Sequence, residues 1–308
     1  MSASDRGSRH PPSVAPVEGE PLGGRYELVQ TLGIGSLSTV YRAMDRRLAV
    51  PRAVKVLHPF ATADGVALER FLDEVRTLAR LEHPNVLRIF DFGRDQGRYF
   101  AVFELADRGG VQRLIDQGGA LPPNRALRIA FQVSSALASA HLHSVIHRDV
   151  RPANVLIGLD GNARLADFGV ARLRHRVTEL SETDIALGAT EYTAPELRSD
   201  FSDADACADV WSVGAVLLFL LTARVPSWPH PVISDDLPTF TARVLRGSLA
   251  FDRAHRYPSA DWLAREIAAA YDGYAASVGL PLRGDAWVEW MDEQLAVARQ
   301  AVGTAAQR

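Results

Sequence analysis

One loop decides the fold: it reads HRDVRPAN at residues 147–154 and follows a long Ala- and Leu-rich segment. Within it, Asp149 and Asn154 place two oxygen-bearing side chains five residues apart. Such side chains can receive a hydroxyl proton and ligate a hard cation. A third group, Asp167, follows eighteen residues after Asp149 and opens the triplet Asp-Phe-Gly. The segment 163–165 before it is typical of a strand, so the order indicates a site for magnesium and phosphate.

The same triplet occurs a second time, at residues 91–93. We interpret this copy as the end of a strand followed by a turn. Only the copy downstream of Asn154 has the order that the cation site requires.

Lysine is nearly absent from the chain, because 34 residues are Lys or Arg and only Lys55 is lysine. It lies in the apolar run 53–57, which predicts a strand. A compact ammonium suits phosphate oxygens at a strand end, where the planar arginine fork is too wide. Upstream, Gly33 and Gly35 stand between two predicted strands, and a chain without Cβ atoms can approach a triphosphate closely. Two glycines alone more often mark a tight hairpin.

The composition is that of a folded, soluble protein. The 308 residues are 47% hydrophobic and 23% charged, which excludes a collagenous, coiled-coil or largely disordered chain. A net charge of −3 gives no sign of nucleic-acid binding. The apolar run 210–223 falls short of the roughly 20 residues of a membrane span and predicts a buried helix. The single Cys207, with no apolar segment after Met1, predicts a reducing cytoplasm.

Periodicity predicts strands first and helices afterwards. Residues 1–24 are expected to be a disordered arm, and two hairpin strands and a third strand follow up to residue 57. An amphipathic helix is predicted over 67–81, and strands over 86–92 and 99–103 with Gly93 and Gly97 in the turn between them. Helices follow over 125–143 and 210–221. The tail from Gly279 carries Trp287 and Trp290 on a predicted helix that either docks on its own lobe or binds a partner.

Taken in order, these motifs resemble the protein kinase family, and most closely the eukaryotic-like Ser/Thr kinases of bacteria, over about residues 25–271. The motifs that carry the resemblance are Gly33 and Gly35, Val54-Lys55, Glu74, His83-Pro84-Asn85, the HRD triplet at 147–149, Asn154, Asp167-Phe168-Gly169, Ala194-Pro195-Glu196, the segment 209–214 and Arg256. This signature set is well defined for the family.

The resemblance implies an α+β, two-lobed kinase fold. A small β-rich N-lobe with one main helix is expected over 25–106, and a larger, mostly helical C-lobe over 107–272. A helical extension is expected over 273–308. Glu196 and Arg256 are expected to form a buried ion pair.

The resemblance also implies roles for the polar residues. Lys55 would hold the α- and β-phosphates of ATP and pair with Glu74, although most helix glutamates are solvated. Asn154 and Asp167 would bind Mg²⁺ or Mn²⁺, and Asp149 would accept the proton of the substrate hydroxyl.

Adenine would lie between apolar side chains of both lobes. By resemblance, Val40, Ala53 and Leu156 sandwich the base. The stretch from Glu104 to Ala106 would be the hinge that offers backbone hydrogen bonds to it.

Four departures from the family pattern matter, and the first is Ser38 in place of the third glycine of the loop. Arg151 stands where a catalytic lysine is expected, two residues after Asp149, and keeps the charge near the γ-phosphate. Ala189 replaces a usual threonine, and residues 226–233 are followed by a deletion of a helix that relatives use in docking substrates.

Ser181 and Thr183 match autophosphorylation positions in the activation loop.

The first functional hypothesis is an ATP-dependent kinase of protein Ser/Thr hydroxyls that autophosphorylates its activation loop, with self-association as a route to that reaction. Neither a nucleic acid nor a membrane span is expected. The alternative is a pseudokinase or weakly active ATP-binding scaffold. A small-molecule phosphotransferase is disfavoured, because such enzymes lack an activation segment ending in Ala194-Pro195-Glu196.

Overall fold

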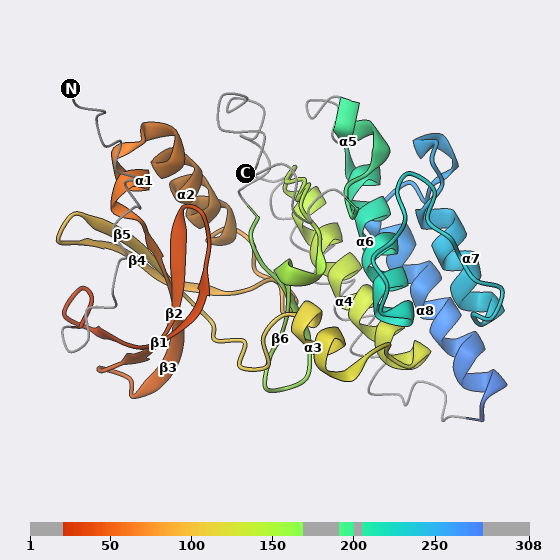
Figure 1. Ribbon diagram of the computed structural model, residues 1–308, viewed down its shortest axis with the longest axis horizontal. Helices are drawn as coiled ribbons and strands as arrows, with labels where there is room; N and C mark the ends of the chain where they lie inside the picture. The colour runs from red at the N-terminus through yellow and green to blue at the C-terminus, as the bar shows by residue number, and fades with distance from the viewer. Residues whose placement is uncertain (1–20, 169–190, 200–204, 280–308) are drawn as a thin grey trace, which may run out of the picture. The chain divides into compact units, whose positions relative to one another are not determined.

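The computed structural model describes residues 21–168, 191–199 and 205–279 (Figure 1). These residues fall into two compact units, which are considered one at a time. Unit 1 holds residues 21–68 and 90–103, and unit 2 holds residues 69–89 together with the described residues from 104 onward. The predicted N-lobe, residues 25–106, therefore differs from unit 1 in that residues 69–89 group with the helical unit.

Unit 1 is built on a five-stranded sheet with strand order β1-β2-β3-β5-β4. The strands are β1 (Tyr26–Ile34), β2 (Ser38–Asp45), β3 (Val50–Leu57), β4 (Ile89–Asp95) and β5 (Arg98–Phe103). The pairs β1 with β2, β2 with β3, and β3 with β5 are antiparallel. The strands predicted up to residue 57 and over 99–103 are present, whereas the strand predicted over 86–92 is β4 and spans residues 89–95. The short helix α1 (Pro59–Ala63), which was not predicted, follows β3.

Residues 21–24 belong to the described structure, so the prediction of a disordered arm over residues 1–24 is wrong for these last residues. Leu22 is buried in the core of unit 1 together with Tyr26, Val54 and Phe100. A tight turn places it there, because the N–H groups of Leu22 and Tyr26 donate to each other's carbonyl oxygens at 2.8 and 3.0 Å. The burial of Leu22 therefore fixes a short segment whose composition is otherwise typical of disorder.

The prediction that put Gly93 in a turn was also wrong. It lies inside β4, which continues to Asp95. A Cβ atom at Gly93 would lie 2.6 Å from Cζ of Phe100, so this glycine lets an aromatic ring pack directly on the strand. The turn falls at Gln96 and Gly97, whose φ angles are 46° and 81°.

The Asp-Phe-Gly copy at 91–93 therefore lies within a strand and has a structural role. Oη of Tyr26 donates to Asp91 Oδ2 at 2.6 Å, and Nη1 of Arg25 donates to the same oxygen at 3.3 Å. Arg25 also donates from Nε and Nη2 to Asp45 at 3.0 and 2.7 Å. These bonds from Arg25 lower the pKa of the Asp45 carboxyl to about 2.

Unit 2 is mostly helical. Its elements are the main part of α2 (Gly65–Leu78), α3 (Val111–Gly118), α4 (Pro123–Leu142), η1 (Pro152–Asn154), the antiparallel hairpin β6 (Val155–Ile157) and β7 (Ala163–Leu165), α5 (Pro195–Ser199), α6 (Ala206–Thr222), α7 (Thr239–Ser248), η4 (Arg253–His255) and α8 (Ala260–Ser277). Helix α4 packs against α6 and α8.

Helix α6 confirms the prediction of a buried apolar helix. Its residues from Ala208 to Leu221 are all buried. Asp205 caps its start by accepting the N–H of Cys207 at 2.8 Å. Helix α4 also matches its prediction, whereas α2 ends at Leu78 instead of residue 81, because Leu81 N donates to Leu78 O in a tight turn.

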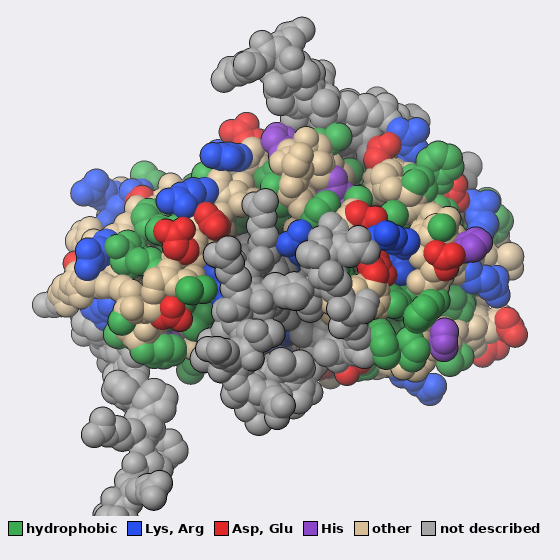
Figure 2. Space-filling model, turned by 90° about the horizontal axis from the view of Figure 1, so that it is seen from above, with side chains coloured by type: hydrophobic (Ala, Val, Ile, Leu, Met, Phe, Trp, Pro, Cys, Tyr) green, Lys and Arg blue, Asp and Glu red, His purple; other side chains and the backbone are tan. Residues whose placement is uncertain are grey.

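Two surface properties concern the described residues alone. No helix among them is both long and apolar enough to cross a membrane. On the face shown in Figure 2, their basic and acidic side chains are interspersed. The predicted activation-loop sites Ser181 and Thr183, the departure at Ala189 and the tryptophans of the tail all lie outside the described residues.

Candidate active site

The loop at 147–154 is anchored by one fully buried carboxylate, that of Asp209 on α6. It accepts the backbone N–H groups of His147 and Arg148 at 2.9 and 2.8 Å, and Nε2 of His141 lies 2.7 Å from its Oδ2. Burial opposes ionisation, but the hydrogen bond from His141 and the charges around the carboxyl keep the pKa of Asp209 below its ordinary value. An ionised carboxylate therefore anchors the start of the loop through two backbone N–H groups.

His147 links this loop to the segment before Asp167. Its Nδ1 accepts the N–H of Asp149 at 3.2 Å, so the proton lies on Nε2, which donates to Ala166 O at 2.9 Å. Its ring also meets the edge of Phe168, with centroids 4.7 Å apart. One imidazole thus bonds both to the backbone of Asp149 and to the backbone directly before Asp167.

Asn154 brings the candidate cation ligands together. Its Nδ2 donates to the carbonyl oxygen and to Oδ2 of Asp149, at 2.8 and 3.1 Å. Its own carbonyl oxygen accepts the N–H of Ala166 at 2.9 Å, next to Asp167. Because the amide nitrogen is engaged by Asp149, the oxygen of the Asn154 side chain is the atom left for a cation.

The candidate ligands fit a cation that binds few protein groups, such as magnesium, better than one that is enclosed by protein ligands on all sides. Among the described residues, no three His, Cys, Asp or Glu side chains converge on one point. Magnesium usually takes one or two carboxylates and fills its other positions with water and substrate phosphates. Asp167 and Asn154 fit that pattern, and the backbone of Asp167, with φ at 61°, adopts a left-handed conformation that is uncommon outside glycine.

The predicted pair of Lys55 and Glu74 is divided between the two units. Lys55 is half-buried on β3 of unit 1, where it lies opposite Val40 on β2 and Ala101 on β5. Glu74 belongs to the part of α2 in unit 2 and is only 4% exposed. A buried glutamate in an amphipathic helix is unusual, so Glu74 is not the solvated surface residue that helix position alone would suggest.

The other predicted residues of unit 1 lie at the turn from β1 to β2 or on strands β2 and β3. Gly33 pairs with Val40, and Gly35 N donates to Ser38 O at 2.8 Å. A Cβ atom on Gly35 would lie 3.3 Å from that same oxygen, so the tight turn favours glycine there. Ala53 is buried on β3.

The predicted hinge belongs to unit 2, as does Leu156, one of the residues predicted to sandwich adenine. The N–H of Glu104 donates to Arg88 O at 2.8 Å, which fixes the start of the hinge. Beyond Ala106, the chain is bound to β6 through Arg108 N to Ile157 O at 3.2 Å and Ile157 N to Gly109 O at 2.8 Å. Leu156, which is predicted to contact adenine, lies on β6 directly before Ile157.

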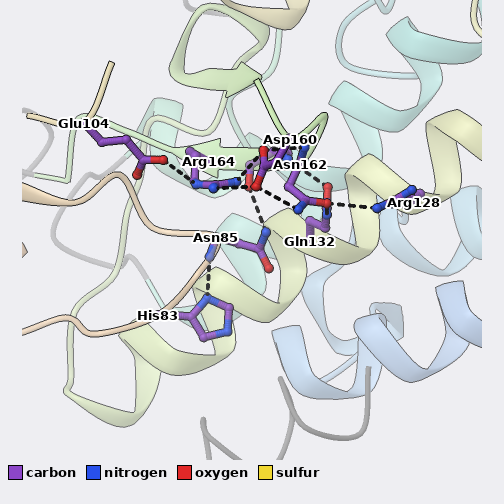
Figure 3. A network of polar contacts seen from close by, with 9 residues as sticks. His83, Asn85, Glu104, Arg128, Gln132, Asp160, Asn162 and Arg164 are labelled. Carbon is purple, nitrogen blue, oxygen red and sulfur yellow. Dashed lines mark hydrogen bonds and ion pairs between the residues drawn. The ribbon is translucent and has the colours of Figure 1, made fainter. Parts of the chain in front are cut away.

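Behind the hinge lies a polar network that the sequence reasoning missed (Figure 3). Arg164 on β7 contacts Glu104, and Asn85 Nδ2 donates to Ala163 O at 2.8 Å. Asn85 N donates to Nδ1 of His83, whose Nε2 lies 3.1 Å from Ser135 Oγ on α4. The predicted His-Pro-Asn motif thus ties the end of α2 to the hairpin and to α4.

The predicted ion pair between Glu196 and Arg256 is confirmed. Nη1 and Nη2 of Arg256 donate to the two carboxylate oxygens of Glu196 at 2.7 and 2.8 Å. This contact fixes α5, directly after the activation segment, to the segment before α8.

Comparison with known proteins decides the family. Residues 26–248 match the protein kinase domain. The chain belongs to the protein kinase family. Members of this family use ATP and a divalent cation. The predicted α+β, two-lobed kinase fold is confirmed by the structure and by the crystal structure of a mutant PknI kinase domain from Mycobacterium tuberculosis, with 28% identity and a TM-score of 0.65 over 83% of this chain and 99% of that one.

Two curated relatives of this kinase domain come from bacteria. It is 30% identical to the Serine/threonine-protein kinase PrkC of Bacillus subtilis over 82% of this chain, and 35% identical to the Serine/threonine-protein kinase PknL of Mycobacterium tuberculosis over 77%. The matches span 42% of PrkC and 59% of PknL, so the chain covers about half the length of these relatives. Their names support the Ser/Thr kinase hypothesis and give no support to the pseudokinase alternative.

Proposed function

We propose that this chain is an ATP-dependent protein Ser/Thr kinase. The observation that carries the proposal is the cluster of Asp149, Asn154 and the backbone before Asp167, which hydrogen bonds of 2.8–3.1 Å hold in unit 2. A cluster fixed in this way offers a proton acceptor beside two oxygen ligands for a cation. The names of the bacterial relatives support the same reaction and the same class of substrate.

In this proposal Asp149 receives the proton of a substrate Ser or Thr hydroxyl. The hydroxyl oxygen bonds to the γ-phosphorus of ATP, the bond from that phosphorus to the bridging oxygen breaks, and ADP leaves. Magnesium, or manganese in its place, held by Asn154 and Asp167, would neutralise the charge on the phosphate oxygens. Most of the catalysis is positioning, which the anchoring of the loop on Asp209 provides.

The remaining predicted residues bind the nucleotide in this proposal. Lys55, oriented by Glu74, holds the α- and β-phosphates, and Arg151 keeps a positive charge near the γ-phosphate. The turn containing Gly33 and Gly35 covers the phosphates with backbone N–H groups.

Val40, Ala53 and Leu156 are the apolar side chains that contact adenine in this proposal. The hinge from Glu104 to Ala106 offers its backbone hydrogen bonds to the base. In this proposal residues 25–106 are the N-lobe of the kinase and residues 107–272 are its C-lobe.

Three further properties belong to the proposal. The kinase autophosphorylates Ser181 or Thr183, with self-association bringing two copies together. It works in the cytoplasm, since its single cysteine, Cys207, cannot form an internal disulfide. Mass spectrometry after incubation with Mg-ATP tests the first property, and finding no phosphate between residues 170 and 188 would contradict it.

The decisive experiment compares the transfer of radiolabelled phosphate from Mg-ATP to a generic protein substrate. Lys55→Met and Asp149→Asn should each lower turnover by roughly 10²–10³ or more, the loss expected when one group that stabilises the transition state is removed. Arg265→Met on α8 is the matched control, since its Nη2 pairs with Asp261 far along the chain from these motifs. Equal rates for the wild type and both site variants would contradict the proposal.

A further inference from the structure

Arg164 on β7 is the one member of the network in Figure 3 that holds carboxylates on two sides. Its Nε donates to Oε1 of Glu104 at 3.1 Å. Its Nη2 donates to Oδ2 of Asp160 at 2.8 Å, and its Nη1 lies 3.5 Å from the other oxygen of that carboxylate. The side chains of Arg164 and Glu104 are 13% and 28% exposed, so water screens their contact less than it would at the surface, whereas Asp160 is 45% exposed.

The position of Arg164 in the hairpin places it beside Leu156, which is proposed to contact adenine. Leu156 and Arg164 are directly opposite each other in the antiparallel register of β6 and β7. Side chains of directly opposed residues leave the same face of a hairpin. The aliphatic stem of Arg164 therefore lies next to Leu156, while its guanidinium reaches to the hinge.

The hinge is attached to unit 2 by its backbone at two places. The first is the bond from Glu104 N to Arg88 O, and the second is the pairing of Arg108 and Gly109 with Ile157 on β6. The stretch that would bind adenine lies between them. The side-chain bond from Arg164 to Glu104 adds a third attachment, at the start of this stretch, and joins it to the strand opposite Leu156.

The other end of the contact is firmly held as well. Asp160 accepts the backbone N–H and the side-chain amide of Asn162 at 3.0 and 2.9 Å. Asn162 Oδ1 in turn accepts from Gln132 and Arg128 on α4, at 2.8 and 2.9 Å. The guanidinium of Arg164 therefore connects the hinge, through the hairpin turn, to the long helix at the centre of unit 2.

We propose that Arg164 is a positioning residue for the nucleotide: by bridging Glu104 and Asp160, it sets the spacing between the hinge backbone and Leu156 and so determines the affinity for adenine. The inference rests on the proposed function. A planar fork with donors on two sides suits this bridge, whereas the single ammonium of lysine can hold only one carboxylate well.

Steady-state kinetics and the direct binding of Mg-ATP test the role. Arg164→Met should raise both KM for ATP and Kd for Mg-ATP about fivefold to tenfold, as expected for the loss of a charge-assisted hydrogen bond that orients a binding surface. The value of kcat should stay within about twofold, because the catalytic groups are untouched. Arg164→Lys should recover part of the affinity.

Three further variants separate positioning from general stability. Glu104→Gln removes the charge of the hinge partner while keeping its shape, and should raise KM for ATP in the same direction. Asp160→Asn removes the other partner and should have the smaller effect. Arg265→Met is the control. Arg265 also pairs with an aspartate four residues earlier, Asp261, at 2.7 Å, but this pair is exposed. The KM of this variant should equal that of the wild type.

Two results would overturn the inference. One is an unchanged KM and Kd in Arg164→Met and Glu104→Gln. The other is a fall in kcat and in melting temperature with KM unchanged, which would mark Arg164 as a structural residue only. Either result in a protein that still phosphorylates its substrate leaves the proposed function intact. A wild type that binds no Mg-ATP would instead refute the proposed function itself.

Discussion

Replacing Glu196 by alanine would leave a positive charge buried and unpaired. The guanidinium of Arg256 has no exposed surface, whereas the Glu196 side chain is 14% exposed. Besides the two bonds to Glu196, Arg256 donates to three backbone carbonyl oxygens, those of Ala250, Cys207 and Phe251, at 2.7, 3.1 and 3.0 Å. These carbonyls still accept bonds after the substitution, but they cannot neutralise the charge.

The expected loss is about 3–5 kcal/mol in the free energy of unfolding, the range for breaking one side of a buried ion pair. At about 2–4 °C of melting temperature per kcal/mol for a protein of this size, the midpoint should fall by about 6–20 °C. Thermal melting followed by circular dichroism, together with urea titration, measures both quantities.

Asp261→Ala is the control, because it breaks an exposed pair with Arg265 and should change the unfolding free energy by less than about 1 kcal/mol. The double variant Glu196→Ala with Arg256→Met should lose less than the sum of the two single variants, since the partners are coupled. A loss below about 1 kcal/mol in Glu196→Ala, or full additivity in the double variant, would refute the argument.

Two further predictions concern stability. Burial lowers the pKa of His83 to about 4, so the unfolded chain takes up a proton near pH 6.5 that the folded protein refuses; the free energy of unfolding should fall by about 2 kcal/mol between pH 7 and pH 5 through this residue. Urea titrations at both pH values should show a correspondingly smaller fall in His83→Gln, and equal falls would be inconsistent with this prediction. Gly93→Ala should destabilise unit 1 by about 1–3 kcal/mol, because the new methyl group meets the ring of Phe100; an unchanged melting midpoint would count against it.

Much of the fold follows from local sequence patterns. The strands of unit 1 and the helices α4 and α6 follow from apolar periodicity and from Gly or Pro at their ends, which act within a few residues. The loop at 147–154 was found because its residue types and spacing combine with the order of the motifs before and after it. Its anchoring on Asp209 depends on two backbone bonds, with sequence separations of 62 and 61, which the structure shows.

The errors have a common physical origin in contacts between residues far apart in sequence. Gly93 reads as a turn because the ring that requires glycine there belongs to Phe100 on the next strand. Leu22 reads as part of a disordered arm because its core partners come from later strands.

Two of the residues missed at the site, His141 and Arg164, bond to side chains far along the chain, those of Asp209 and Glu104. His141 could have been noticed as an imidazole within an Ala-rich helix six residues before His147. Arg164 gave no such signal, because almost every cation in this chain is an arginine.

The scarcity of lysine has a practical chemical consequence. Since the half-buried Lys55 on β3 carries the chain's sole ε-amine, an amine-directed acylating reagent has one side-chain target, besides the terminal amine. The mass added by such a reagent therefore reports on a single known atom, and its suppression by a competing molecule measures occupancy at that atom without any engineered label.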